Sequence, residues 1–247
     1  MTDVFGDRSA QWAQWQAEPW GRVRYAVVAE VLRRTVTGTG LRVLDVGGGD
    51  GQDGVPLAAA GHSVTVLDRS PDLLGRAAEH GFATRVADLD DEPADLQGAF
   101  DVVLCHNVLH YLDDVAGAVD RLTAFLAPGG VVSLMAPTPA MDVLAAAVRR
   151  LDPAEALALL DARTVHGQTF DHPMNRLESA TVEEALQRSG LTVTGRYGVR
   201  CVTDLVTDDD RKRDPEFFAR LLALELALCD REPFRRTGRF WLLTARR

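Results

Sequence analysis

The sequence predicts an α/β protein built on a doubly wound, mostly parallel sheet. Apolar, β-branched segments alternate with helical stretches through the first half of the chain, which is the order that βαβ units produce. Near-continuous hydrophobicity in these segments is typical of parallel strands that helices cover on both faces. The segments are LRVLDV, SVTVLD, ATRVAD, DVVLCHNVL and GGVVSLMAP.

Two more strands are predicted at 191–202 and 239–247. They flank the helical segment DPEFFARLLALELALC, whose apolar residues recur at spacings of three and four. We expect these two strands to pair antiparallel. The complete prediction is a seven-stranded, mostly parallel sheet with an antiparallel C-terminal edge strand.

The chain of 247 residues is expected to form a single domain, 1–247. Residues 138–180 are longer than an ordinary connection and contain the amphipathic stretch PAEALALLDAR, so a substrate-covering insertion is predicted there. The N-terminal segment 1–30 carries Trp12, Trp15 and Trp20. We expect it to act as a lid, and the alternative is that these aromatic side chains anchor a helix to the domain.

Composition excludes several classes of protein. The net charge of −9 argues against general nucleic-acid binding. No apolar run approaches the roughly 20 residues of a membrane span, and the N-terminus lacks a signal-peptide pattern, so a cytoplasmic protein is expected. Three cysteines, Cys105, Cys201 and Cys229, show no CxxC spacing, so neither a disulfide framework nor a metal site is predicted.

A glycine-rich loop follows the first strand directly. The pattern DxGxGxG is formed by Asp45, Gly47, Gly49 and Gly51. Glycine allows the chain to turn sharply and lets a ligand touch the main chain. Asp68 ends the next strand at roughly the 20-residue spacing where an acidic side chain meets ribose hydroxyls. The two strand ends together predict a nucleoside site.

Two further strand ends carry candidate site residues. After the third strand, the Asp88 carboxylate is placed to accept an adenine amino group, with the Leu89 backbone beside the ring. In an open α/β sheet, the site forms at this carboxyl edge. The fourth strand ends in polar side chains, at least one of which should face the ligand: His106, Asn107, His110 and Tyr111.

A dinucleotide site is the competing interpretation of the loop, because residues 49–54 also satisfy GxGxxG. A dinucleotide site offers helix N-terminal amides to a pyrophosphate. Asp50 and Asp53 place negative charge where those phosphates would lie. A cationic sulfonium therefore suits the loop better than a pyrophosphate.

Over nearly its whole length the chain resembles the class I S-adenosylmethionine-dependent methyltransferases, which share a Rossmann-like sheet. Within them it is most similar to the bacterial tRNA carboxymethoxyuridine methyltransferases. The segments that carry the likeness are WGRVRYAVVAEVL, LRVLDVGGGDGQ, LCHNVLHYL, VVSLMAP, YGVRCVTDLV and LLALELALCDREPFRRTGRFWLLTARR. The GVR and CDREPF…GRF segments are the more particular to this family.

The resemblance implies S-adenosyl-L-methionine as the cofactor. Arg24 would hold the cofactor's carboxylate, Asp68 and Arg69 would flank the ribose, and Arg200 would hold a carboxylate of the substrate. The complete cofactor set is Arg24, Asp45, Gly47, Gly48, Gly49, Asp68, Arg69, Asp88, Leu89 and His106, and the substrate set is Arg200 and Tyr111. No catalytic base is assigned, because an ionised carboxylate needs only alignment behind the methyl group. An ion pair with Asp204 is the alternative role for Arg200.

The acceptor is less well defined than the cofactor. Where relatives carry a lysine-rich run, this chain reads LDARTVHGQTFDHPMNRLES, with few basic residues and several acids. Phosphate contacts supply most nucleic-acid affinity, so a tRNA partner is a weakened expectation. One alternative is an O- or carboxyl-methyltransferase acting on a small metabolite. Another is a nucleoside-binding protein without catalysis.

Overall fold

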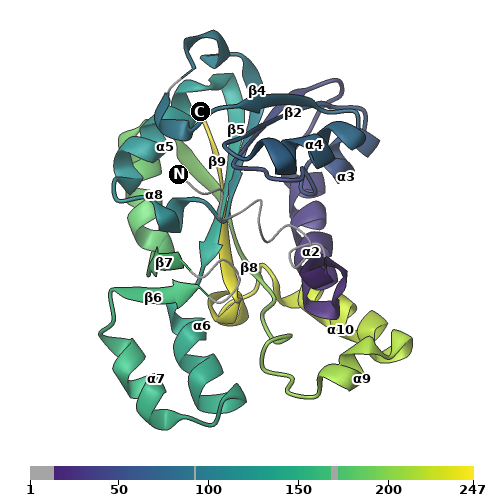
Figure 1. The fold of residues 1–247 in the computed structure, drawn as a ribbon, viewed down its shortest axis with the longest axis vertical. Coiled ribbons are helices and arrows are strands. Elements are labelled where there is room, and N and C mark those ends of the chain that lie inside the picture. Colours follow the sequence, from purple (N-terminus) through teal and green to yellow (C-terminus); the bar gives the residue numbers. More distant parts are fainter. Residues whose placement is uncertain (1–13, 92, 168–171) are drawn as a thin grey trace.

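The computed structural model describes residues 14–91, 93–167 and 172–247 (Figure 1). The strands are β1 (Arg42–Val46), β2 (Ser63–Asp68), β3 (Ala83–Val86), β4 (Phe100–His106), β5 (Leu126–Pro137), β6 (Thr164–Gly167), β7 (His172–Asn175), β8 (Thr192–Val199) and β9 (Phe240–Arg246). The helices are α2 (Pro19–Thr35), α3 (Val55–Ala59), α4 (Pro71–Glu79), α5 (Val115–Ala124), α6 (Pro139–Leu144), α7 (Pro153–Leu160), α8 (Ser179–Arg188), α9 (Asp209–Arg213) and α10 (Pro215–Leu228).

The main sheet has seven strands in the order β3-β2-β1-β4-β5-β9-β8. Strands β1 to β5 pair in parallel, and β9 pairs antiparallel with both β5 and β8. The predicted α/β class, the strand number and the antiparallel pairing are confirmed. One detail differs from the prediction: the C-terminal strand β9 lies one place in from the edge, and β8 forms the edge.

Helices cover both faces of this sheet (Figure 1). Helices α5 and α8 pack over one face in a core that includes Val119, Leu122 and Leu186. Helices α2, α3, α4 and α10 contribute to the core on the other face, where Val27 and Val31 of α2 are buried. This doubly covered sheet explains why its central strands read as apolar runs.

The predicted insertion folds as its own group of elements beside the sheet. It contains α6, a π-helical turn at Ala145–Arg149, α7 and the hairpin of β6 and β7 (Figure 1). The amphipathic stretch predicted there forms α7. Of the predicted lid, 1–30, residues 1–13 and therefore Trp12 lie outside the described residues, whereas Trp15 and Trp20 lie within them.

Two absences bear on the expected partners. Among the described residues, no helix combines the length and the apolarity that a membrane crossing requires. The same part of the chain holds no group of three or more His, Cys, Asp or Glu side chains arranged to bind a metal ion.

A buried carboxylate on α10 fixes the turn that follows β8. The side chain of Glu225 is fully buried and accepts backbone N–H groups from Cys201, Val202 and Thr203 at 2.6, 3.0 and 2.7 Å. It also accepts the Thr203 hydroxyl. Lys212, the only lysine of the chain, is buried as well and donates to the Thr203 carbonyl. These contacts hold the segment that begins with Arg200.

We predict that Glu225→Gln lowers the free energy of unfolding by about 1 to 3 kcal/mol, because an amide N–H₂ would face a backbone N–H in a dry site. Urea denaturation measures this loss. Glu216→Gln, on the exposed side of the same helix, is the matched control and should change stability by less than about 0.5 kcal/mol. Equal effects of the two variants would contradict the account.

Candidate functional site

A cavity of about 870 Å³ opens at the carboxyl ends of β1, β2 and β4. This is where an open α/β sheet places its ligands. Every residue of the predicted cofactor and substrate sets lines this cavity. These residues are Arg24, Asp45, Gly47, Gly48, Gly49, Asp68, Arg69, Asp88, Leu89, His106, Tyr111 and Arg200.

Two glycines of the loop after β1 are required by close packing. Gly47 has φ +65°, and a Cβ there would collide with the Val108 side chain. A Cβ at Gly48 would lie 2.5 Å from Cγ of Asp45. The loop therefore passes directly over the Asp45 carboxylate, and its main chain faces the cavity.

The carboxylate of Asp68 is fixed against this loop. It ends β2, and its oxygens accept the backbone N–H groups of Gly49 at 2.9 Å and Ser70 at 2.8 Å. The Gly47 N–H donates to the Leu67 carbonyl at 2.7 Å. The loop and the end of β2 thus form one rigid edge of the cavity. Asp88 and Leu89 follow β3 and line the same edge, as does Arg69.

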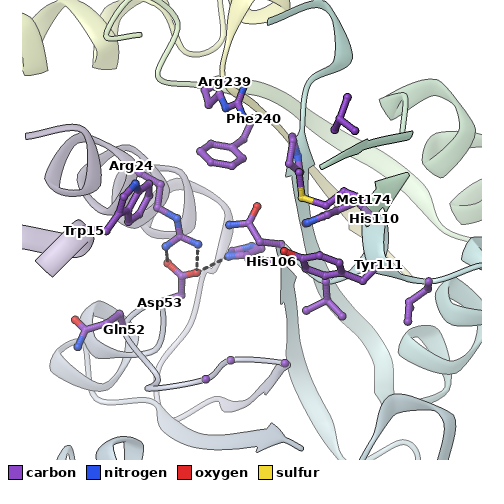
Figure 2. Close-up of a pocket in the computed structure, with 18 of the residues that line it drawn as sticks. Trp15, Arg24, Gln52, Asp53, His106, His110, Tyr111, Met174, Arg239 and Phe240 are labelled. Carbon is purple, nitrogen blue, oxygen red and sulfur yellow. Dashed lines mark hydrogen bonds and ion pairs between the residues drawn. The ribbon is translucent and has the colours of Figure 1, made fainter. Parts of the chain in front are cut away.

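A chain of buried polar side chains crosses the cavity wall. The Arg24 guanidinium donates to both oxygens of Asp53, and Oδ2 of Asp53 lies 2.9 Å from Nδ1 of His106 (Figure 2). Nε2 of His106 lies 2.9 Å from the Ser133 hydroxyl. The chain joins α2, the glycine loop, β4 and β5. Both ring nitrogens of His106 are therefore engaged in the protein.

Asp53 has a different role from the one its position in the loop indicated. Burial alone would raise its pKa, but the Arg24 guanidinium and the His106 imidazole hold the pKa well below the ordinary value. Its negative charge is matched by Arg24, so it does not stand as open charge facing a ligand. Asp50 differs too, since it accepts the Gln16 amide at 2.9 Å.

Two buried atoms at this end of the cavity have no partner among the described residues. They are Nε of Arg24, a donor, and Oδ2 of Asp45, an acceptor. Buried polar atoms are almost always hydrogen-bonded, so an unpaired donor and acceptor mark places for ligand atoms. A carboxylate at Arg24 and an ammonium group at Asp45 would satisfy both. The arrangement therefore suits the zwitterionic end of an amino acid.

The ionised form of the Asp45 carboxyl is electrostatically unfavourable in this site. Burial raises the pKa of this carboxyl well above its usual range, and the neighbouring Asp53, Asp68 and Asp50 raise it further against the opposing effect of Arg24. Its position under Gly48 keeps it from reaching water. A cationic group of a ligand would offset this cost.

Arg200 lies at the end of the β8 segment with φ +63° and is buried. Its Nε donates to Asp204 at 2.9 Å, and its Nη2 pairs with the second oxygen of that carboxylate. The ion pair weighed as its alternative role is therefore present, and one complete edge of the guanidinium is occupied. Burial lowers the pKa of Arg200, and Asp204 opposes that shift. The rings of Trp15 and Phe240 lie 5.7 and 5.6 Å from its guanidinium carbon.

The short 3-10 helix after β4 presents two further side chains, His110 and Tyr111. Their rings lie 4.1 Å apart by centroid. Burial lowers the pKa of His110 to about 3, with a smaller contribution from Arg239, and burial raises the pKa of Tyr111 to about 12. Neither side chain can accept a proton from an acceptor at neutral pH, because His110 is too weak a base and Tyr111 is already protonated.

Several residues of the site escaped the sequence analysis. Ser133 and Asp142 carry no motif, Asp53 was predicted only as loop charge, and Arg239 was given no role within the GRF segment. Arg24 and Asp53 are 29 positions apart, and Asp142 and Arg239 are 97 apart. The signals that existed were the acid at Asp53 inside a glycine loop and the GRF segment that contains Arg239.

We predict that Asp45→Asn stabilises the ligand-free protein by about 0.5 to 2 kcal/mol at neutral pH, because it removes a buried charge with an unpaired oxygen. A carboxyl whose pKa is raised on folding stabilises the fold only while protonated, below its ordinary pKa of about 3.9, and that stability is lost as pH rises through the folded pKa. The gain should therefore shrink as pH falls towards 3.9. Thermal melts across this pH range measure it, and a destabilised variant at neutral pH would contradict the assignment.

Known proteins resemble this chain in sequence and in fold. The family described as Methyltransferase domain matches residues 20–195. The tRNA 5-carboxymethoxyuridine methyltransferase of Escherichia coli (strain K12) is 31% identical over 242 residues, covering 92% of this chain and 89% of that protein. A ubiquinone biosynthesis O-methyltransferase of Xanthomonas oryzae pv. oryzae (strain PXO99A) is 35% identical over 114 residues, or 43% of this chain and 48% of that protein.

The crystal structure of an S-adenosylmethionine-dependent methyltransferase from Mesorhizobium loti superimposes with a TM-score of 0.61 at 25% identity, covering 89% of this chain and 98% of that one. The dinucleotide interpretation of the loop and the non-catalytic interpretation of the site are therefore set aside. The family match and the similarity to these proteins agree with the glycine loop and the acidic strand ends of the cavity. The chain therefore belongs to the S-adenosylmethionine-dependent methyltransferases and is similar to the tRNA 5-carboxymethoxyuridine methyltransferase of Escherichia coli.

Proposed function

We propose that this methyltransferase forms a methyl ester on a carboxylate, and that the carboxylate belongs to a carboxymethoxyuridine in tRNA. The activity of the Escherichia coli relative, a tRNA 5-carboxymethoxyuridine methyltransferase that matches most of the chain, supports this acceptor. A tRNA acceptor also agrees with the cytoplasmic location expected from the sequence. The observation that carries the carboxylate is the row of arginines that lines one side of the cavity, Arg149, Arg150, Arg200 and Arg239.

The cofactor fits the acidic side of the cavity. Arg24 and Asp45 would hold the carboxylate and the ammonium of its methionine part, through the two atoms that lack partners. Asp68 with Arg69 would flank the ribose, and Asp88 with Leu89 would frame the adenine. The main chain of Gly47, Gly48 and Gly49 would pack against the methionine part of the cofactor. The bound cofactor supplies a methyl group on a cationic sulfur.

The opposite side of the cavity is formed by residues of 138–180 and by the ends of β8 and β9, and we call it the insertion side. Four arginines line it, each paired with an acid: Arg149 with Asp209, Arg150 with Glu155, Arg200 with Asp204, and Arg239 with Asp142. Arginine is suited to planar carboxylates because its donors match two oxygens. This side is therefore built for an anionic acceptor.

Two buried side chains that line the cavity, His110 and Tyr111, favour an acceptor that needs no base. His110 has a pKa of about 3 and Tyr111 one of about 12, so neither removes a proton at neutral pH. A hydroxyl acceptor would need such a base, whereas a carboxylate is already ionised. One carboxylate oxygen would attack the methyl carbon while the carbon–sulfur bond breaks and leaves its electron pair on sulfur. No proton moves, and the protein's task is alignment.

Two segments would cover the reactants. The insertion 138–180 lines one side of the cavity through residues such as Arg149 and Met174. On the other side, the described part of the N-terminal lid reaches the glycine loop through the bond from Gln16 to Asp50, and Trp15 reaches Arg200. Both segments would belong to one domain, 1–247, and would exclude water during transfer.

A small carboxylic acid is the second candidate acceptor. It is favoured by the net charge of −9 and by the few basic residues in 138–180, since tRNA affinity depends on phosphate contacts. The same arginines would bind a metabolite's carboxylate. The two candidates share the reaction and differ in the size of the acceptor.

We predict base-labile methylation of tRNA that carries carboxymethoxyuridine. The experiment supplies methyl-labelled S-adenosylmethionine with that tRNA, with tRNA that lacks the modification, and with a pool of small carboxylic acids. Mild alkali then distinguishes an ester, which releases labelled methanol, from an ether or an amine, which does not.

Alkali-labile label only in modified tRNA supports the full proposal. Label only in the acid pool retains ester formation and replaces the acceptor. Alkali-stable label in any fraction contradicts the carboxylate acceptor, because it would require a nucleophile other than a carboxylate.

A further inference from the structure

We propose that Arg239, acting beside Arg200, is the residue that binds the acceptor carboxylate and selects an acid over a neutral acceptor. This inference rests on the proposed function and deepens it. The resemblance to the family implied that Arg200 alone binds the carboxylate of the acceptor. Three observations assign the main part of this carboxylate-binding role to Arg239. They are the strand register, the use of each guanidinium edge, and the contacts that position the Arg239 side chain.

The register of the sheet places the two arginines side by side. Strands β8 and β9 are antiparallel, and their last described pair is Val199 with Phe240. One step further, the Arg239 N–H donates to the Arg200 carbonyl at 3.1 Å. On its other side, the Arg239 carbonyl accepts the Thr138 N–H at 3.0 Å, just beyond β5. Arg239 is therefore the middle residue of three adjacent strand ends, and both arginines line the cavity.

The two guanidinium groups differ in how many donors remain for a ligand. Arg200 donates to Asp204 from Nε and Nη2, which consumes one two-pronged edge. Arg239 donates to Asp142 from Nη1 alone, at 2.7 Å. Within the described residues, the Nε–Nη2 edge of Arg239 makes no contact with an acid. A carboxylate needs such an edge for two parallel hydrogen bonds.

Accessibility also favours Arg239. The side chain of Arg239 is 27% exposed, whereas that of Arg200 is 7% exposed. Figure 2 shows Arg239 beside Phe240, across the cavity from Asp53 and Gln52. It thus faces the cavity from the side opposite the glycine loop, where the acceptor would enter.

Arg200 and Arg239 carry like charges on adjacent strands, so their guanidinium groups repel each other in the ligand-free protein. Burial is the main cause of the lowered pKa of Arg200, and the charge of Arg239 lowers it further. The same charge contributes to the lowered pKa of His110. An anion bound between the arginines would relieve the repulsion. A neutral acceptor would not, which is the physical basis of the selectivity.

The insertion holds Arg239 in place. Asp142, its partner, lies in α6, and Nε of Arg176 approaches the same carboxylate at 3.9 Å. Arg176 in turn donates to the carbonyls of Pro139 at 2.7 Å and Ala162 at 3.0 Å. The acceptor site is thus tied to the fold of the insertion, and Asp142 is a positioning residue.

The test measures binding of two small probes to the full-length protein saturated with S-adenosylhomocysteine. Phenoxyacetate supplies an aryloxyacetate carboxylate, and phenoxyacetamide is its neutral counterpart. Arg239→Gln should weaken phenoxyacetate binding by about ten- to a hundred-fold, the value of a charge-assisted pair, and change phenoxyacetamide binding by less than about two-fold. Titrations followed by nuclear magnetic resonance determine both dissociation constants.

Three further variants separate binding from folding. Arg196→Gln removes an exposed β8 arginine that pairs with Glu183, and it should bind both probes like the parent. Asp142→Asn keeps an Oδ1 that can accept the hydrogen bond from Arg239 Nη1, so the guanidinium stays in place and phenoxyacetate binding should be retained. The double variant Asp142→Asn/Arg239→Gln restores a neutral hydrogen-bonded pair, so it should fold and still show the loss.

Phenoxyacetate binding that survives in both Arg239 variants would overturn the inference, and so would the absence of phenoxyacetate binding in the parent. An equal loss for both probes would also overturn it, because it would indicate a general disturbance of the cavity. This result can be distinguished from a failure of the proposed function. If the enzyme does not methylate tRNA but binds phenoxyacetate through Arg239, the tRNA acceptor is rejected and the carboxylate site is retained.

Discussion

The site depends on one buried pair, the guanidinium of Arg24 against the carboxylate of Asp53. Each charge offsets the cost of burying the other, because burying a lone charge costs several kcal/mol. The pair reaches His106 and, through it, Ser133, so one hydrogen-bonded chain fixes α2, the glycine loop, β4 and β5 relative to each other. Both Nη atoms of Arg24 donate to Asp53, whereas its buried Nε has no hydrogen-bond partner among the described residues.

Around this pair, the cavity divides into two sides of different composition. Asp45, Asp50 and Asp68 line the side next to the glycine loop, and four arginines, each paired with an acid, line the insertion side. Under the proposed function, a cationic sulfur donor meets the acids and an anionic acceptor meets the arginines. Transfer of the methyl group neutralises both reacting centres, so each product loses an electrostatic attraction that its precursor had. Product release follows from the same arrangement that binds the reactants.

Sequence reasoning reached the parts of the site that depend on local structure. Gly47 and Asp68 were predictable because a sharp strand-to-loop turn and a strand-end acid leave patterns at fixed spacing. The place of β9 between β5 and β8 was not, since periodicity carries no strand order. Long-range pairs were equally hidden: nothing in the loop sequence shows that Asp53 faces Arg24, or that Arg239 lies opposite Arg200. The pairing of Arg200 with Asp204 was foreseeable because the two are four positions apart.

The central claim is that the Arg24–Asp53 pair shapes the cofactor site, and calorimetric titration of S-adenosylmethionine into Asp53→Asn tests it most directly. An asparagine keeps the size of the side chain but removes the charge that orients Arg24. The account predicts affinity weakened by about ten- to a hundred-fold, the range for losing one hydrogen bond to a charged group. Exposed Asp72→Asn on α4, measured alongside, should bind like the parent. Unchanged affinity in a folded Asp53→Asn protein would contradict the account.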